Sequence, residues 1–514
     1  MEKILVLDFG GQYNQLIARR VRDHHVYAEI LPYTTPIETI KENGYKGIIF
    51  TGGPNSVFDM SSPHYTKDIL ELGVPVLGIC YGCQLIAWMG DGKVETAPVS
   101  EYGKIEVTVG ESKLFKDIPE KSVTWMSHTD YIAEPPKGYE IIAHTDDCPC
   151  AAMQNTQKNI YAVQFHPEVT HSVYGKEILH NFLYEICRCS GDWVMDNFIE
   201  NTVKSLRKKI GDKNVILGLS GGVDSSVAAG LLSRAVGKQL TCVFVDQGLM
   251  RKDEGDFVEE TFTRLFDMNF VRVNCGDHFM QCLKGVTDPE QKRKIIGTEF
   301  YKVFWDEVRA RASEGYFAQG TIYPDRIESG KGKSAGKANT AVIKTHHNMV
   351  EKPKDINFID TIEPLGDLFK DEVRAVGEKL GIPHELVWRQ PFPGPGLGVR
   401  IIGEVTADKV KILQDADWVL RDEMSKNGYE SNLAQFFCVL PGVNSVGVMG
   451  DHRTYDNVVV IRAVTTDDFM TADWAKIPYD ILAKVSNRIT NECAHINRVV
   501  YDITSKPPGT VEWE

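Results

Sequence analysis

Short runs of apolar residues recur along residues 1–388, and helical patterns separate them. Apolar and often β-branched runs lie at residues 4–7, 47–50, 76–79, 215–219, 241–246 and 270–274. Their length, and the glycines or other small residues after several of them, predict buried strands. Strands that alternate with helices form parallel βαβ units. The pattern therefore predicts an α/β protein with two doubly wound, mostly parallel sheets.

Residues 389–514 follow a different pattern. The stretch 389–400 holds three prolines and three glycines, which exclude a helix or a central strand there. A strand-like run at 458–463 and a helical pattern at 479–495 follow, and together they predict a small α+β module. A chain of 514 residues fits about three domains, which we place at 1–190, 191–388 and 389–514. A charged helix over 193–209, with Asp192 as its cap, is expected to connect the first two.

The segment Ser220-Gly-Gly-Val-Asp-Ser-Ser226 lies between the predicted strand 215–219 and a helical pattern that stops at Gly237. Two adjacent glycines let the backbone approach an anion, and the helix N-terminus offers unpaired N–H groups. The residue types therefore suit a loop that holds phosphate. The alternative is an ordinary strand-to-helix turn capped by Asp224 or Ser225. A Walker loop is excluded because no lysine precedes the serine pair.

A second strand-to-helix turn is predicted at Gly78-Ile-Cys-Tyr-Gly82, which has the spacing of a nucleophile elbow with cysteine in place of serine. Flanking glycines relieve crowding in such a turn. We expect Cys80 to be exposed there, with its thiolate favoured by the N-terminus of the following helix. Cys80 is therefore a candidate nucleophile.

A base for this nucleophile is offered by Val163-Gln-Phe-His-Pro-Glu168. His166 can take the thiol proton, and Glu168 can orient the imidazole and stabilise its charged form. The alternative is redox chemistry, because Cys80 and Cys83 form a CxxC pair at a strand–helix junction, as in thioredoxin-like proteins. The His-Pro-Glu sequence argues against that alternative.

Composition limits the possible partners and compartment. Apolar residues make up 42% and charged residues 25% of the chain, and no apolar run reaches membrane-spanning length. No signal peptide is visible, so we expect a cytoplasmic protein without a membrane partner. The net charge of −14 disfavours a nucleic-acid partner. The eleven cysteines do not form two CxxC motifs in series, which predicts free thiols in a reducing compartment, with neither a disulfide framework nor a zinc site.

The elbow, Thr51-Gly-Gly-Pro54 and the Gln-Phe-His-Pro-Glu run resemble the class I glutamine amidotransferases. The resemblance implies hydrolysis of glutamine to ammonia. It assigns catalysis to Cys80, His166 and Glu168, oxyanion-hole N–H groups to Gly53 and Tyr81, and contacts with glutamine to Gln84, His128 and Asp130. The chain departs from the family at Thr129, where glycine is usual, and at Cys83, where methionine is more common.

The Ser-Gly-Gly-x-Asp-Ser-Ser pattern resembles the PP-loop of the ATP pyrophosphatases. The segments 289–297, 318–325, 344–348, 389–400 and 503–514 resemble the glutamine-hydrolysing GMP synthetases, although by composition alone 289–297 is typical of a solvated helix face. The chain departs from that family at Met349-Val350-Glu351. The resemblance implies ATP contacts at Ser220, Gly221, Gly222, Val223, Asp224, Ser225, Ser226, Val245 and Lys370, nucleotide contacts at Arg293, Arg389, Lys506 and Glu512, and a Mg²⁺ ligand at Asp371.

The reaction implied by the resemblance is the ATP-dependent amination of xanthosine monophosphate by ammonia from glutamine. A homodimer formed through the third domain is also implied. An NAD synthetase is the alternative with the same loop, and the loop 389–400 and the tail 503–514 argue against it. A nucleotide sensor without turnover conflicts with the catalytic residues present, and a tRNA-modifying enzyme conflicts with the acidic charge. A chain end is commonly frayed, but Lys506, the proline pair and Trp513 argue against fraying of this tail.

Cys83 has two interpretations. It lies one helical turn after Cys80, so it is placed to capture an oxidised Cys80 as a disulfide. The methionine usual at this position in the family instead indicates a side chain that packs in the core.

Overall fold

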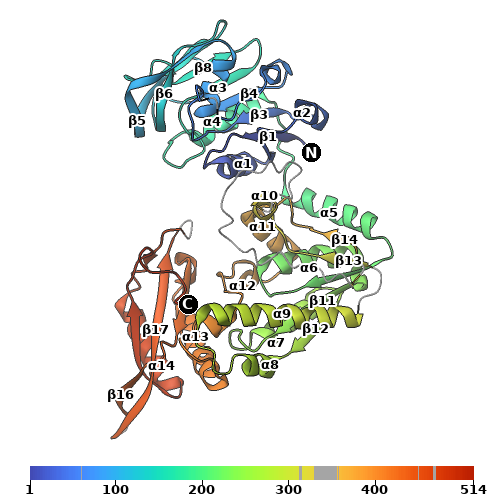
Figure 1. Cartoon of the computed structure of the whole chain (residues 1–514), viewed down its shortest axis with the longest axis vertical. Coiled ribbons are helices and arrows are strands. Elements are labelled where there is room, and N and C mark those ends of the chain that lie inside the picture. The colour runs from blue at the N-terminus through green and yellow to red at the C-terminus, as the bar shows by residue number, and fades with distance from the viewer. Residues whose placement is uncertain (60, 312–314, 329–355, 357, 450, 467–469) are drawn as a thin grey trace. The chain divides into compact units, whose positions relative to one another are not determined.

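The computed structural model describes residues 1–514 except 60, 312–314, 329–355, 357, 450 and 467–469 (Figure 1). The segment 344–348 and the departures at 349–351 therefore lie outside the described residues. The chain divides into two compact units. One comprises residues 1–200 with 323–341, and the other comprises 201–322 with 342–514.

The first unit contains a nine-stranded sheet in the order β2-β1-β3-β4-β9-β8-β7-β5-β6. The strands β2, β1, β3, β4 and β9 run parallel, and β8, β7, β5 and β6 continue the sheet with antiparallel pairs. The strands are β1 (Lys3–Asp8), β2 (Tyr27–Pro32), β3 (Gly47–Phe50), β4 (Val76–Ile79), β5 (Lys93–Val109), β6 (Lys121–Glu134), β7 (Glu140–His144), β8 (Ala152–Asn155) and β9 (Ile160–Val163).

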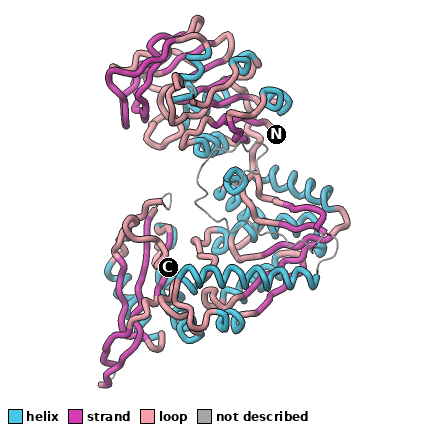
Figure 2. The backbone as a smooth tube through the Cα atoms, in the orientation of Figure 1, coloured by secondary structure: helices cyan, strands magenta, loops and turns pink. Residues whose placement is uncertain are grey.

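Helices accompany the parallel half of this sheet (Figure 2). They are α1 (Asn14–Asp23), α2 (Ile37–Asn43), α3 (Tyr81–Met89) and α4 (Gly175–Asn181), with short turns η1 (Lys67–Glu71) and η2 (Phe182–Ile186), and α10 (Tyr323–Glu328) groups with the same unit. The parallel strands β3, β4 and β9 are buried along their whole length. Strands covered on both faces have no polar side, which is why the sequence shows continuous apolar runs there.

The second unit begins with a five-stranded sheet, all parallel, in the order β12-β11-β10-β13-β14. Its strands are β10 (Asn214–Gly218), β11 (Leu240–Asp246), β12 (Asn269–Asn274), β13 (Gly315–Ala318) and β14 (Phe358–Ile362). Its helices are α6 (Val223–Val236), α7 (Glu254–Leu265), α8 (Gly276–Cys282), α9 (Pro289–Arg311), α11 (Lys370–Leu380) and α12 (His384–Val387), with the short turns η3 (Gly237–Gln239) and η4 (Gly396–Val399). The helix α5 (Met195–Ile210) leads into this sheet.

The last part of the second unit is a smaller α+β layer. Strand β17 (His452–Thr465) pairs with β15 (Gln435–Val439), β16 (Asn444–Met449), β18 (Asp473–Trp474) and β19 (Ile496–Asp502). The elements α13 (Ala407–Lys426), η5 (Glu430–Asn432) and α14 (Tyr479–Glu492) complete it. Buried apolar residues of α13, α14, β15 and β17 share one core cluster. The predicted fold class, two doubly wound mostly parallel sheets and a small α+β module, is confirmed.

The predicted connecting helix differs from the structure at its start. It was expected to begin at residue 193 with Asp192 as its cap, but α5 begins at Met195. The carboxylate of Asp192 instead accepts hydrogen bonds from the backbone N–H of Glu2 and pairs with the N-terminal amine. Asp192 lies three residues before Met195, so it is too far from the first turn to occupy the N-cap position. The exclusion of helix from 389–400 is also too strict, because residues 396–399 form one 3₁₀ turn.

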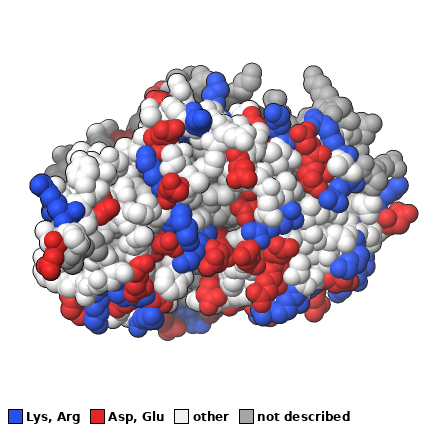
Figure 3. Space-filling model, turned by 90° about the horizontal axis from the view of Figure 1, so that it is seen from below, with Lys and Arg blue, Asp and Glu red and all other residues white. Residues whose placement is uncertain are grey.

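Charged side chains of both signs are interspersed on the face seen in Figure 3. Although the net charge is −14, that face does not form one continuous acidic surface. Among the helices of the described residues, none has the length and apolar character required to cross a bilayer.

The turn at Cys80 depends on close backbone contacts. A Cβ at Gly82 would lie 2.6 Å from both Cβ and the carbonyl oxygen of Phe50, and a Cβ at Gly78 would lie 2.7 Å from the carbonyl oxygen of Gly82. Atoms at such distances overlap, so β3, β4 and α3 can meet only where these side chains are absent.

We predict that Gly82→Ala lowers the free energy of unfolding of the first unit by about 1–3 kcal/mol, because the added methyl forces β3 and α3 apart. Urea unfolding followed by tryptophan fluorescence measures the change. Gly110→Ala is the matched control, since a Cβ at Gly110 would meet only one atom, the Ile142 carbonyl oxygen, at an ordinary 3.6 Å. Equal stability of the two variants would contradict the crowding at this turn.

Candidate functional site

Cys80 lies at the turn between β4 and α3, with φ 52° and ψ −108°. This left-handed conformation is rare for a residue with a side chain and is typical of a nucleophile elbow. The prediction that Cys80 is exposed is wrong, because only 8% of its surface is accessible. The Sγ atom lies 3.8 Å from the carbonyl oxygen of Ser127 and 3.9 Å from Nε2 of Gln164. The turn thus presents the sulfur to an enclosed pocket instead of to bulk water.

His166 and Glu168 lie beside this turn and are buried. The Nδ1–H group of His166 donates to Oε1 of Glu168 over 2.7 Å. Burial lowers the pKa of His166, but the negative charge of Glu168 and hydrogen bonds with Cys80 and Glu168 more than offset it and raise that pKa to about 11. The imidazole is therefore protonated at neutral pH and faces the cysteine sulfur. The structure brings the three predicted catalytic residues together.

The two predicted oxyanion donors are adjacent. Tyr81 is the first residue of α3, so its N–H has no acceptor within the helix. A Cβ at Gly53 would lie 3.0 Å from Cγ of Tyr81, and a Cβ at Gly52 would lie 3.4 Å from Cε1 of His166. Because Gly52 has no side chain, it leaves room for the imidazole of His166. Sequence reasoning marked the glycine pair at this strand end but did not assign Gly52 to the site.

A pocket of about 510 Å³ opens over Cys80. It is lined by Gly10, Gly11, Gln12, Tyr13, Gly52, Gly53, Pro54, Asn55, Ser56, Cys80, Tyr81, Gln84, Tyr102, Ser127, His128, Thr129, Asp130 and His166. The volume and the mixture of backbone and polar side-chain groups suit a small polar molecule. All the predicted glutamine-site residues line this pocket.

Within the wall of the pocket, Gln84 and His128 both bond to the backbone of Asp130. Nε2 of Gln84 donates to the Asp130 carbonyl oxygen over 2.7 Å, and Nδ1 of His128 contacts the same oxygen at 3.1 Å. The carboxylate of Asp130 accepts from Thr96 over 2.9 Å. Gln84 and His128 thus hold the backbone of β6 at Asp130, as well as lining the pocket.

At two positions of this unit, 83 and 129, the residue differs from the one usual in the amidotransferase family, and the structure shows how each side chain is accommodated. Thr129, which stands where glycine is usual, is not among the described residues with positive φ, and its hydroxyl bonds to that of Tyr102 at 2.7 Å. The backbone there does not need glycine. Cys83 is fully buried in the core, and burial, with a smaller effect of Cys150, raises the pKa of its thiol well above the usual range. The packing interpretation of Cys83 is therefore favoured over the disulfide.

In the second unit, the loop from β10 to α6 has the geometry of an anion cradle. Gly221 has φ +74°. The N-cap residue of α6 is Gly222, and no side chain makes a capping hydrogen bond there, so the alternative of a turn capped by Asp224 or Ser225 is wrong. The hydroxyls of Ser225 and Ser226 donate to the Gly222 carbonyl oxygen over 3.1 and 2.8 Å. The first backbone N–H groups of a helix have no acceptor within the helix and suit an anion, which is why this turn is a candidate phosphate site.

Two basic side chains reach this loop. Nζ of Lys370, the first residue of α11, lies 2.6 Å from Oδ2 of Asp224. Nη1 of Arg389 donates to the Gly221 carbonyl oxygen over 3.0 Å, and Arg389 also pairs with Glu254. Arg389 was predicted to contact the substrate nucleotide, and the structure places it on the phosphate loop.

Three arginines surround the ring of Phe392 in the proline-rich loop. The guanidinium carbons of Arg251, Arg389 and Arg400 lie 4.5, 5.5 and 5.2 Å from the ring centroid. Burial, and the like charges of Arg421 and Arg389, lower the pKa of Arg251 well below its usual range. Sequence reasoning did not assign Arg251, because Phe392 brings the arginines together only in the folded chain.

The carboxyl-terminal tail is ordered against this region. Nζ of Lys292 donates to the Ile401 carbonyl oxygen over 2.6 Å and to Oε2 of Glu514 over 2.5 Å, and Arg293 bonds to the Glu514 backbone. Lys292 is fully buried, so the solvated helix face that composition favoured for 289–297 is wrong at this position. The expectation that the tail is not frayed is confirmed by the contacts of Glu514 with Lys292 and Arg293.

Glu512 and Lys506 lie in different parts of the tail. Glu512 accepts two hydrogen bonds from the buried guanidinium of Arg400, over 2.9 and 2.7 Å, and one from Gln435 over 2.9 Å. Lys506 exchanges backbone hydrogen bonds with Ala472, and the peptides Lys506–Pro507 and Pro507–Pro508 are cis. The structure therefore joins Glu512 to the proline-rich loop, and it joins the backbone of Lys506 to the strand region at Ala472.

Family models match three stretches of the chain. Residues 5–186 match the family Glutamine amidotransferase class-I, residues 195–291 match NAD synthase, and residues 422–513 match the GMP synthase C terminal domain.

Relatives extend over the whole chain. A protein of Ruminiclostridium cellulolyticum, described as GMP synthase [glutamine-hydrolyzing], is 59% identical over 514 residues, which cover 100% of this chain and 99% of the relative. Proteins with the same description from Clostridium botulinum and Acetivibrio thermocellus are 58% and 59% identical over the same lengths. Identity at this level over the full length decides against the NAD synthase alternative. The chain therefore belongs to the family of glutamine-hydrolysing GMP synthases.

Proposed function

We propose that the protein aminates xanthosine monophosphate to GMP, with ammonia from glutamine and with ATP as the activating substrate. The observation that supports this most strongly is the presence in one chain of a Cys-His-Glu elbow and a PP-loop, together with full-length identity to the family. Each site is assigned one half of the reaction.

In the first half, the sulfur of Cys80 attacks the side-chain amide carbon of glutamine. The N–H groups of Gly53 and Tyr81 stabilise the oxyanion that forms. The imidazolium of His166, held by Glu168, gives its Nε2 proton to the leaving nitrogen, and ammonia departs. Water then attacks the thioester, with His166 as base, and glutamate is released. Gln84, His128 and Asp130 are assigned to the wall that receives glutamine.

In the second half, O2 of the xanthine ring attacks the α-phosphorus of ATP and pyrophosphate leaves. Ammonia then adds to C2, the C2–O bond breaks, and AMP departs. We assign the stabilisation of pyrophosphate to the N–H groups of residues 220–226 and to Lys370, with Val245 in the strand beside them. Oxygen bound to phosphate is a much better leaving group than the bare carbonyl oxygen, which is why ATP is needed.

We assign the nucleotide substrate to the region where the tail meets α9 and the proline-rich loop. Arg293 contacts Glu514 there, Glu512 is fixed by Arg400, and Arg389 and Arg400 beside Phe392 offer positive charge for phosphate. Arg389 lies between this region and the phosphate loop, so it is assigned to both substrates. Lys506 is assigned to the nucleotide by the family resemblance alone.

We further propose a magnesium ion at the phosphate loop. Asp371 is exposed in the first turn of α11, one residue after Lys370, which reaches Asp224. Mg²⁺ is usually held by one or two carboxylates together with phosphate oxygens and water, and these residues fit that requirement. When bound, the ion would offset the charge of the triphosphate.

The domain division 1–190, 191–388 and 389–514, a homodimer through the last of these, and a cytoplasmic location remain parts of the proposal. Family resemblance supports the dimer. The distinct sheets of residues 1–200, 201–388 and 389–514 support the division, with each half-reaction assigned to its own sheet.

We predict that Cys80→Ala reduces glutamine-dependent GMP formation by roughly 10⁴-fold and leaves ammonium-dependent formation within about 2-fold of wild type. Free ammonia bypasses only the first half-reaction. Initial rates with glutamine or an ammonium salt, each with xanthosine monophosphate and ATP, measure this. The mirrored control is Asp224→Ala, which should retain glutaminase activity and lose synthesis with either nitrogen source. Loss of both activities in Cys80→Ala would contradict the division of work.

Glu168→Gln is predicted to move the alkaline limb of the glutaminase pH profile downward. The carboxylate of Glu168 is the main influence that raises the pKa of His166 to about 11, so without it that pKa falls toward the ordinary 6.5. The imidazolium is then lost as pH rises through the neutral range instead of near pH 11. The pH dependence of the ammonium-dependent rate is the control and should not move. An unchanged alkaline limb would show that Glu168 does not set the charge of His166.

Deletion of residues 506–514 is predicted to raise the KM for xanthosine monophosphate at least about 10-fold while glutaminase activity stays unchanged, because the tail supplies Glu512 and Glu514 to the nucleotide region. Trp513→Phe is the control, since it removes only the single hydrogen bond from the indole to Asp502. A normal KM in the truncated protein would exclude the tail from substrate binding.

A further inference from the structure

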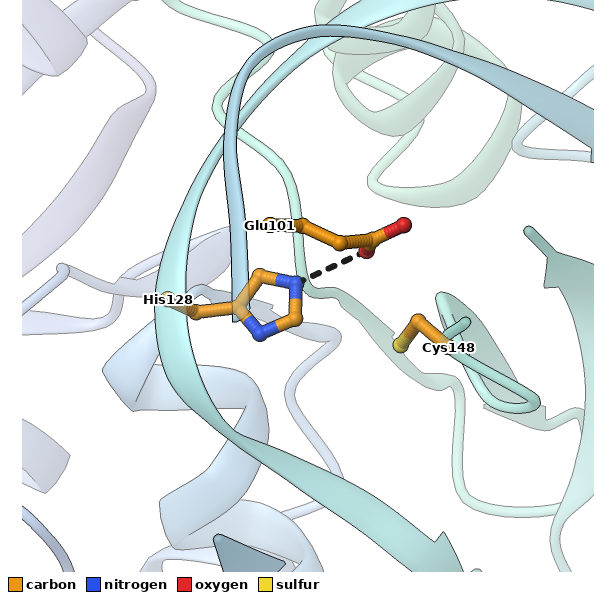
Figure 4. Close-up of side chains that lie close together, drawn as sticks. All are labelled: Glu101, His128 and Cys148. Atoms are coloured by element: carbon orange, nitrogen blue, oxygen red, sulfur yellow. Dashed lines mark hydrogen bonds and ion pairs between the residues drawn. The ribbon is translucent and has the colours of Figure 1, made fainter. Parts of the chain in front are cut away.

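A buried cluster of three potential metal ligands lies in the first unit, beside the wall of the glutamine pocket. Figure 4 shows the side chains of Glu101, His128 and Cys148 directed toward one another from three different segments. One ligand atom of each lies within 4.8 Å of the other two, and all three residues are buried. Glu101 belongs to β5, His128 to β6, and Cys148 to the turn between β7 and β8.

The sheet register brings the first two ligands together. Glu101 and His128 are directly opposed in the antiparallel ladder of β5 and β6, next to an irregularity between Thr96 and Glu101. Opposed residues on one face of a ladder have neighbouring side chains, and a bulge redirects them. Nε2 of His128 and Oε2 of Glu101 are consequently 3.1 Å apart.

Each ligand is held by a second hydrogen bond. Nδ1 of His128 faces the carbonyl oxygen of Asp130 at 3.1 Å, so Nδ1 must carry the proton and Nε2 points into the cluster. The hydroxyl of Thr145 donates to Oε1 of Glu101 over 2.6 Å and accepts from the backbone N–H of Cys148 over 2.8 Å. Such outer contacts fix the orientation of metal ligands.

We propose that Glu101, His128 and Cys148 bind a zinc ion. Zinc takes thiolate, imidazole and carboxylate ligands together, and at bond lengths of about 2.0–2.3 Å its ligand atoms are roughly 3.3–3.6 Å apart in a tetrahedron. The present separations therefore need a movement of about 1 Å to close on the ion. Water takes the fourth position, and the thiol proton of Cys148 passes to solvent when zinc binds.

The ion would connect β5, β6 and the turn 145–150 at the base of the pocket wall. His128 lines the glutamine pocket, and its neighbour Thr129 and Asp130 line it as well. Zinc at this place would steady the part of β6 that lines the pocket, and none of its three ligands is a catalytic residue of the elbow. The site is therefore structural, and its loss should destabilise the first unit before it affects the synthetase half.

Among the described residues, two other groups of side chains could also bind the metal, and an experiment must distinguish them from this cluster. Cys80 and His166 form a soft ligand pair of their own. His278, Cys282 and Glu299 form a second cluster, with Nε2 of His278 2.8 Å from Glu299 and 3.8 Å from the sulfur of Cys282, but its residues are only partly buried.

The experiment uses Co²⁺ as a spectroscopic substitute for zinc on the full-length Cys80→Ala protein, in which the catalytic thiol is absent. We expect one equivalent to bind with a thiolate-to-cobalt charge-transfer band in the near ultraviolet, and stoichiometric zinc to displace it. The band should disappear in Cys80→Ala/Cys148→Ser. It should persist in Cys80→Ala/Cys282→Ser, the control for the partly buried cluster.

A second measurement does not depend on the thiol. Zinc should raise the thermal unfolding temperature of the first unit in the wild-type protein and in Cys282→Ser, and a chelator should reverse the rise. Glu101→Gln should bind zinc at least about 10-fold more weakly and show no such rise. A single cooperative thermal transition of the first unit, measured without added metal, shows that this unit is folded in each variant.

Three results would overturn the proposal. One is a band that is lost in Cys80→Ala and kept in Cys148→Ser, which would place the metal on the catalytic pair. Another is a band that is lost with Cys282→Ser, which would place it on the partly buried cluster. The third is failure of Cys80→Ala to bind either ion, which would leave Glu101 and His128 as a buried hydrogen-bonded pair.

Discussion

Phe50 and Gly82 approach so closely that a methyl group on the glycine would lie 2.6 Å from the Phe50 backbone, and the first active site depends on that contact. It lets α3 start directly at the end of β4, which forces Cys80 into its left-handed conformation and turns the sulfur toward the pocket. The free N–H of Tyr81 follows from the same turn. Nucleophile, oxyanion donor and pocket thus share one geometric cause.

The second unit uses the same connection for a different ligand. The chain passes from β10 through Gly221, with φ +74°, into α6, and Gly320 lies against the first turn, where a Cβ would be 3.0 Å from the Ser225 nitrogen. Here the helix N-terminus has no nucleophile beside it, and hydroxyls and basic side chains surround it. In the proposed function, a strand that leads straight into a helix therefore serves covalent catalysis in one unit and phosphate binding in the other, according to the residues on the turn.

Buried charge organises the nucleotide region. Arg400, Arg462 and Lys292 are fully buried, and each is bonded to groups of the tail: Arg400 to Glu512, Arg462 to the carbonyl oxygens of Thr504 and Thr510, and Lys292 to Glu514. An unpaired charge in such a place is strongly unfavourable. The tail is thus held by the charges that it neutralises, and its carboxylates remain close to the proposed substrate site.

The sequence by itself determined the strands, the two glycine turns, the fold class and the trio Cys80, His166 and Glu168, because each rests on local periodicity or on a short run of residues. The sequence wrongly predicted that Cys80 is exposed. It also did not reveal that Lys292 is buried or that three arginines surround Phe392. Only the tertiary structure decided these, since Lys292 and Glu514 are 222 positions apart and burial depends on which segments meet. The same reason explains why cysteine spacing predicted no zinc site, whereas strand register pairs Glu101 with His128 and the turn after β7 brings Cys148 to them.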